Sequence, residues 1–161
     1  MINGLILTIL ITLIPFLELR FSIPFAVLAG SVKFPFGMVV QGLGLNPLTS
    51  ITLIIITNII LGMFLFLFFE KLGHLFLKKK RYQRFLEKRK RKISRYVDKY
   101  GVLGVALFIG IPLPGSGVYS GSFGAFLIGM KRRDYYIANL IGVLISGGVI
   151  SLITLVLKVA V

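Results

Sequence analysis

Two charged residues interrupt an apolar stretch near the N-terminus, and they are the first candidates for chemistry. Glu18 and Arg20 are the only charges between residues 1 and 32. Ionisable side chains are costly inside a hydrophobic segment and often mark an ion or substrate site. A carboxylate there can carry a proton or cation, and a guanidinium can bind phosphate through its planar fork. A structural ion pair, or two side chains reaching the membrane interface, is the alternative interpretation.

A second candidate is the stretch from Gly110 to Gly121, where two prolines and four glycines occur in twelve residues. Such a sequence cannot continue a helix. Within a membrane, irregular backbone is tolerated only where protein packs around it or where it lines a polar cavity. A tightly packed structural turn is the alternative to a binding loop. The predicted re-entrant breaks are Pro24, Pro112, Pro114, Gly115, Gly117 and Gly121.

This loop offers backbone N–H groups and hydroxyls beside a half-helix expected to begin near residue 118. Positive helix N-terminal ends attract anions. Two asparagines within apolar runs could cap or bridge such loops, or serve only in packing. The candidate substrate- or ion-binding residues are therefore Glu18, Arg20, Asn58, Ser116, Tyr119, Ser120 and Asn139.

Other kinds of chemistry have no support in the sequence. The chain has no cysteine, and its single histidine, His74, lies in a basic segment, so no metal site is expected. There is no Gly-x-Ser-x-Gly motif, no phosphate-binding Gly-x-x-x-x-Gly-Lys motif and no cluster of histidine with carboxylates. We therefore expect neither an enzyme nor a cofactor.

Composition indicates an integral membrane protein. Of 161 residues, 57% are hydrophobic, and the mean hydropathy is +0.95. The net charge of +14 would suggest nucleic acid in a soluble protein. Because the charge is concentrated beside hydrophobic segments, anionic lipid headgroups are the expected partner and nucleic acid is not. The length suggests one membrane domain, residues 1–161.

The elements that must position these residues follow from segment lengths. Residues 5–17 would rise about 20 Å as a helix, against a hydrocarbon core of about 30 Å. With residues 21–30 they predict a re-entrant hairpin broken at Glu18 and Arg20. A single tilted span over residues 3–30 is less favourable, because both charges would lie near its centre. A connection follows over residues 31–49, with a short interfacial helix as an option over 36–43.

Two segments are long enough to span a membrane, residues 48–69 and 135–157. Between them, residues 70–100 predict a basic amphipathic connector on the headgroups. Residues 101–113 and 118–130 predict a second short pair around the Pro/Gly break. The order of short segment, break, short segment and span thus occurs twice. We expect an all-α membrane protein of two inverted repeats, 1–69 and 101–161, joined by the connector.

Charge distribution gives an independent topology. Sixteen of the 19 Lys and Arg residues lie in 70–100 and 131–133. If each hairpin returns to its own side, these segments share one face of the membrane. The positive-inside rule makes that face cytoplasmic, with both termini outside.

Two motifs resemble a known family. Glu18-Leu-Arg-Phe-Ser-Ile-Pro24, and Gly110-Ile-Pro-Leu-Pro-Gly-Ser-Gly-Val-Tyr-Ser-Gly121 with Gly129-Met130, look like the small multidrug export protein family, which is related to the DedA/VTT superfamily. The resemblance implies two inverted re-entrant hairpins that meet near the midplane, a homodimer, and translocation of lipid phosphates such as undecaprenyl phosphate in the DedA-like relatives. It makes Glu18 the hairpin acid and Arg20 its basic neighbour. DedA relatives carry an Arg in the second hairpin, whereas this chain has small and hydroxyl residues there.

Three functions follow as expectations. The first is translocation of an anionic lipid phosphate through the hairpins, with ion coupling as an option and Arg20 as the clamp. The second is proton-coupled export of hydrophobic cations, with Glu18 as the acid. The third is a membrane assembly factor without transport.

Overall fold

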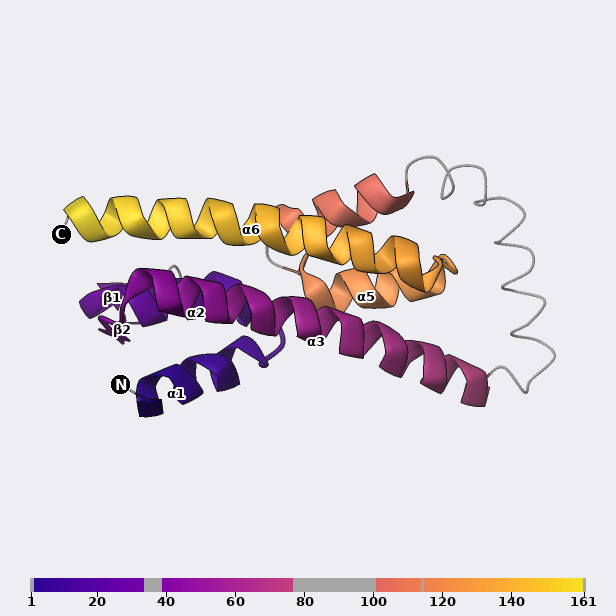
Figure 1. Ribbon diagram of the computed structural model, residues 1–161, viewed down its shortest axis with the longest axis horizontal. Coiled ribbons are helices and arrows are strands. Elements are labelled where there is room, and N and C mark those ends of the chain that lie inside the picture. The colour runs from indigo at the N-terminus through magenta and orange to yellow at the C-terminus, as the bar shows by residue number, and fades with distance from the viewer. Residues whose placement is uncertain (1, 34–38, 77–100, 114, 161) are drawn as a thin grey trace. The chain divides into compact units, whose positions relative to one another are not determined.

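The computed structural model describes residues 2–33, 39–76, 101–113 and 115–160 (Figure 1). The chain is mainly helical, as the sequence predicted. It divides into two compact units, and the division falls inside both long helices. Unit 1 comprises Met1–Asn58 with Leu144–Val161, and unit 2 comprises Ile59–Val143.

Unit 1 begins with two short helices, α1 (Ile2–Thr12) and α2 (Glu18–Val27). The break between them was predicted at Glu18 and Arg20, which is wrong: it occupies residues 13–17, and Glu18 begins α2. Pro15 explains the position, because the residue before a proline is disfavoured in the helical conformation. The predicted break at Pro24 is also wrong, since Pro24 lies inside α2.

A small antiparallel sheet follows α2. Strands β1 (Ala29–Lys33) and β2 (Val39–Leu43) pair in register from Ala29↔Leu43 to Lys33↔Val39. The interfacial helix expected over 36–43 is thus wrong for residues 39–43, where β-branched Val39 and Val40 favour a strand; residues 36–38 lie outside the described part. The chain leaving β2 bonds the end of α2, through Gly44 N to Leu28 O and Leu45 N to Ala26 O, both 2.8 Å.

Two long helices match the predicted spans and extend beyond them. They are α3 (Pro47–Phe76) and α6 (Arg132–Ala160). Asn46 caps α3 by accepting a hydrogen bond from Leu48 N at 3.0 Å, with Pro47 at the first helical position. Both helices are long and apolar enough to cross a membrane.

The surface of these helices suits lipid better than water. Only 28% of the most apolar window of each is buried within the protein, whereas the core helix of a soluble protein is mostly buried. Large apolar side chains such as Ile60, Phe64 and Leu152 are 60%, 63% and 67% exposed. Exposed apolar surface of this extent marks a membrane or protein contact.

Unit 2 contains a second pair of short helices, Gly101–Gly110 and α5 (Val118–Leu127). Residues 111–117 separate them, so a break at Pro112 is observed. Gly115 and Gly117 have φ of 86° and 134°, conformations that L side chains rarely adopt. Gly121 was predicted as part of the break, but it lies inside α5. Pro114 and connector residues 77–100 lie outside the described part, and residues 70–76 continue α3.

Candidate functional site

The interior of unit 1 is rich in polar side chains. In α1, Thr8 and Thr12 are fully buried, and in α2 Ser22 is fully buried while Glu18 is 4% exposed. The four-residue spacing puts each pair on one face of its helix. Thr12 Oγ1 and Ser22 Oγ join the two helices by a hydrogen bond of 2.9 Å. Glu18 therefore starts a helix whose buried face carries the Ser22 hydroxyl, which is bonded to Thr12 of α1.

Backbone geometry at the start of α2 is unusual. Phe16 and Glu18 have φ of 71° and 42°, in the left-handed region that non-glycine residues rarely occupy. The Glu18 carbonyl accepts a hydrogen bond of 2.7 Å from Ser22 Oγ. Arg20 is partly buried, and its charge interacts with that of Glu18. The two residues that the sequence singled out thus lie in one electrostatic environment.

Asn58 and Asn139, the two candidate asparagines, differ in their hydrogen bonding. Asn58, in α3 and unit 1, is fully buried, and neither side-chain atom has a partner in the part of the chain described. Asn139, in α6 and unit 2, is also fully buried, but its Nδ2 donates to Ile59 O at 3.0 Å. Asn139 fastens α6 to α3 and so has a structural role.

The cluster around Asn139 contains residues that the sequence analysis missed. Tyr135 and Ser122 are fully buried, and their hydroxyls lie 2.6 Å apart. Tyr135 also donates to Gly62 O at 3.2 Å and to Asn139 Oδ1 at 3.5 Å. Phe66 stacks on Tyr135 with ring centroids 4.4 Å apart. Ser122 and Tyr135 gave no signal because their partner, Gly62, is distant in sequence.

The Pro/Gly loop uses its own polar groups. Ser116 Oγ donates to the carbonyls of Ile111 and Leu113, at 2.6 and 2.9 Å, and accepts from Leu113 N at 3.3 Å. Ser116 N donates to Leu113 O at 3.1 Å. Ser116 therefore closes a turn, as the structural alternative expected. Ser120 lies in the first turn of α5, 3.5 Å from Gly117 O, and Tyr119 beside it is partly buried.

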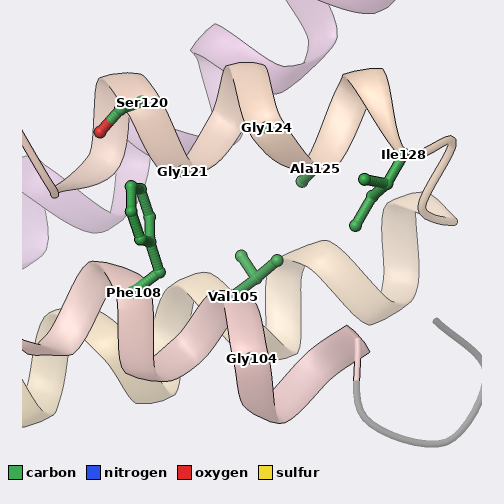
Figure 2. A pocket seen from close by; sticks show the side chains of 8 residues that line it. All are labelled: Gly104, Val105, Phe108, Ser120, Gly121, Gly124, Ala125 and Ile128. Atoms are coloured by element: carbon green, nitrogen blue, oxygen red, sulfur yellow. The ribbon is translucent and has the colours of Figure 1, made fainter. Parts of the chain in front are cut away.

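An apolar pocket of about 330 Å³ lies between the helix of residues 101–110 and α5 (Figure 2). Ser120 supplies the only hydroxyl among the lining side chains, and Phe108 points across the gap toward α5. Gly104 and Gly124 have nothing within 4 Å of where a Cβ would stand. The pocket can hold hydrocarbon but offers no charge. Its lining residues are Gly104, Val105, Phe108, Ser120, Gly121, Gly124, Ala125 and Ile128.

A comparison with known families identifies the chain. The model of the family described as "Putative small multi-drug export protein" matches residues 18–149. The chain belongs to this family. The match begins at Glu18 and includes both long helices in large part. Neither a search of curated proteins nor a search of solved structures found a match.

For this small multi-drug export family member, the structure gathers the predicted site residues only in part. Glu18 and Arg20 share α2, Asn139 joins a hydrogen-bonded cluster, and Ser116 and Ser120 bond within their own loop and helix. In the described residues, no group of His, Cys, Asp and Glu is placed to hold a metal ion. Of the acidic residues that the structure describes, Glu18 at the start of α2 is the one that is buried.

Proposed function

We propose that the protein is a membrane transporter that exports small hydrophobic cations in exchange for protons, with Glu18 as the ionisable group. The observation that carries this proposal is the burial of Glu18, only 4% exposed, in a unit whose interior is lined with hydroxyls. The family description, with its reference to multi-drug export, supports a transport role.

The chemistry follows from the cost of burying charge. A carboxylate removed from water is stable when a cation neutralises it or when it binds a proton. Arg20 supplies part of that neutralisation, because its charge interacts with that of Glu18. A cationic substrate and a proton would compete for the same carboxylate, and this competition is the basis of exchange.

Translocation of a lipid phosphate is the second candidate, and Arg20 is the observation in its favour. Its partly buried guanidinium could bind a phosphate. The loop of residues 111–117 offers fewer groups to a phosphate than expected, because the Ser116 hydroxyl and the amides of Leu113 and Ser116 already bond within the loop. For this reason we rank cation export first.

The wider architecture is part of the same proposal. We propose that each short helix pair is a re-entrant hairpin, that the two repeats are inverted, and that two copies form a homodimer. Support comes from the division of the chain, since each unit holds one helix pair and part of both long helices. Residues 70–100 and 131–133 would face the cytoplasm and bind anionic headgroups, with both termini outside.

Transport in proteoliposomes tests the function. In wild-type protein, an imposed pH gradient should drive the transport of tetraphenylphosphonium in the direction opposite to the protons. Glu18→Gln should abolish this transport, and Glu18→Asp should retain part of it. Asp134→Asn is the matched control, since Asp134 is an acid outside unit 1 in the first turn of α6. Export by Glu18→Gln at the wild-type rate would contradict the proposal.

Parallel vesicles with a fluorescent polyprenyl phosphate separate the two candidates. Movement of that lipid, lost in Arg20→Ala and independent of the pH gradient, would favour lipid phosphate transport. Absence of flux for both probes, together with a protein that co-purifies, would favour an assembly role.

A further inference from the structure

The pocket of unit 2 lies between two short helices that are in contact at one point and apart at others. A Cβ on Gly121 of α5 would overlap Ile109 of the helix of residues 101–110, so the two helices touch there. Gly104 and Gly124 have nothing within 4 Å of the same position, and the missing side chains leave space between the helices. Figure 2 shows this space, with Ile128 at one end.

Hydrocarbon is the filling that suits this pocket. A buried water molecule needs about two to four polar partners. The lining offers one side-chain hydroxyl, that of Ser120, which already lies 3.5 Å from Gly117 O. An empty space would forfeit dispersion contacts along the lining. Phe108 lines the pocket, and it is exposed together with Leu103 and Leu107 of the same helix, so the pocket adjoins an apolar surface.

The size of the pocket distinguishes an acyl chain from a helix of a second copy. One turn of an α-helix, about 5.4 Å long and about 10 Å across with its side chains, takes up more than about 400 Å³. The pocket has a volume of about 330 Å³, which is too small for that turn. A methylene group is about as large as a water molecule, about 30 Å³, so the pocket has room for about ten methylenes of one acyl chain.

Basic residues are held beside one end of the pocket by the way α5 ends. Met130 N donates to Ala125 O and Gly129 N donates to Phe126 O, both at 3.0 Å, and Gly129 has a φ of 72°. This is a Schellman motif, which fixes the path of the chain after the helix. Ala125 lines the pocket. Lys131 therefore follows directly on a residue that is hydrogen-bonded to the pocket wall.

The charge at this end of the pocket favours an anionic headgroup. Lys131 and Arg133 are exposed, and neither forms an ion pair within the part of the chain that the structure describes. Arg132 between them is paired with Glu70 at 2.6 Å, and Asp134 follows as a second acid. The three cations exceed the two acids, so a phosphate is attracted here and a hydrophobic cation is repelled.

We propose that this pocket binds one acyl chain of an anionic glycerophospholipid whose phosphate contacts Lys131 and Arg133. An acyl chain gains little hydrophobic energy on leaving the bilayer for the pocket, because lipid tails are as apolar as the pocket lining. The headgroup contact therefore decides which lipid is retained. The site rests on the headgroup contact proposed above for residues 131–133, but it does not depend on cation export or on Glu18.

Photolabelling of the full chain in nanodiscs tests the site. The probe is a phosphatidylglycerol with a diazirine in one acyl chain, and a phosphatidylcholine with the same chain is the matched probe. After irradiation, labelled peptides are identified by mass spectrometry. We expect phosphatidylglycerol to label residues 101–110 and 118–128 at least about fivefold more than phosphatidylcholine, since each basic residue near an anionic headgroup contributes about fivefold to binding.

Filling the pocket should remove this labelling. Gly124→Leu places a side chain in the open space and should lower labelling by both probes at least about fivefold, to the level of the surrounding apolar surface. Gly104→Leu fills the same pocket from the other helix and keeps the test informative if the first variant fails to fold. Gly148→Leu is the matched control, because Gly148 also has nothing within 4 Å but lies outside the pocket.

The headgroup contact is tested separately. Lys131→Gln combined with Arg133→Gln should lower labelling by phosphatidylglycerol to the level of phosphatidylcholine and leave phosphatidylcholine unchanged. Lys158→Gln, which removes a cation in the last turn of α6, should change neither.

Wild-type labelling in both pocket-filling variants would overturn the site, and equal labelling by the two probes in the unmodified chain would overturn its anionic headgroup. Loss of label on addition of tetraphenylphosphonium would assign the pocket to the exported cation, and loss on addition of an equimolar polyprenyl phosphate would assign it to that lipid; either result would overturn a glycerophospholipid. Glu18→Gln should label as the wild type does, so failure of the export proposal is distinguishable from failure of this site.

Discussion

The hydroxyl of Tyr135 illustrates how individual residues hold unit 2 together. It lies 2.6 Å from Ser122 Oγ and 3.2 Å from Gly62 O, and so links helices α6, α5 and α3. All of its partners are buried in an apolar surrounding, where competition from water is weak. The cluster is therefore a structural feature, and we do not assign it to transport.

Removal of this hydroxyl should destabilise the protein. We expect Tyr135→Phe to lower the free energy of unfolding by about 1 kcal/mol, because a buried hydrogen bond is lost while the ring can still stack on Phe66. Thermal unfolding of detergent-solubilised protein measures the change. Tyr136→Phe is the matched control, since Tyr136 is partly exposed. Equal unfolding temperatures for both variants would contradict a stabilising role for the cluster.

At the scale of elements, close packing of helices depends on particular glycines. A Cβ on Gly62 of α3 would overlap the Asn139 side chain and Val118, whereas a Cβ on Gly148 of α6 meets nothing within 4 Å. Glycines recur along both long helices, but the sequence alone does not show which of them face a neighbouring helix.

We predict opposite effects of alanine at these two glycines. Gly62→Ala should destabilise by about 1–3 kcal/mol, because the added methyl must displace the Asn139 amide. Gly148→Ala should be neutral or stabilise by up to about 1 kcal/mol, because alanine favours the helix. Denaturant titration of each variant distinguishes them. A stabilised Gly62→Ala variant would mean that the helices are not packed as closely as described.

A helix or a break could be predicted from the sequence where a single local property, such as hydropathy or proline and glycine content, determines it. Hydropathy and length placed α3 and α6, and the density of proline and glycine placed the break after residue 110. The first break was misplaced because the charges of Glu18 and Arg20 were given more weight than Pro15. Strand β2 was missed because its pairing with β1 depends on a partner strand that local sequence does not specify.

At the scale of the whole molecule, the site was less predictable than the spans. A charge in an apolar segment singled out Glu18, which is buried, but Asn58, which has no hydrogen-bond partner among the described residues, and the bonded Asn139 look alike in sequence. Hydrogen-bond partners depend on which helices meet, and that is a property of tertiary packing. The sequence therefore identified the polar residues without separating structural from functional roles.

Membrane topology distinguishes a re-entrant hairpin from a single span. If α1 and α2 return to their own side, Asn3 in α1 and Gln41 in β2 lie on the same face of the membrane; if residues 3–30 cross it, they lie on opposite faces. Both side chains are exposed. The positive-inside rule places both outside and exposed Lys131 inside.

We therefore expect Asn3→Cys and Gln41→Cys to react with an impermeant maleimide added to intact cells, and Lys131→Cys to react only after the membrane is permeabilised. Each variant of this cysteine-free chain reports one position. Reaction of Gln41→Cys but not Asn3→Cys in intact cells would mean that the first helix pair crosses the membrane. Glu18 would then lie within a full span, and the site would have to be sought along that helix and not in a hairpin.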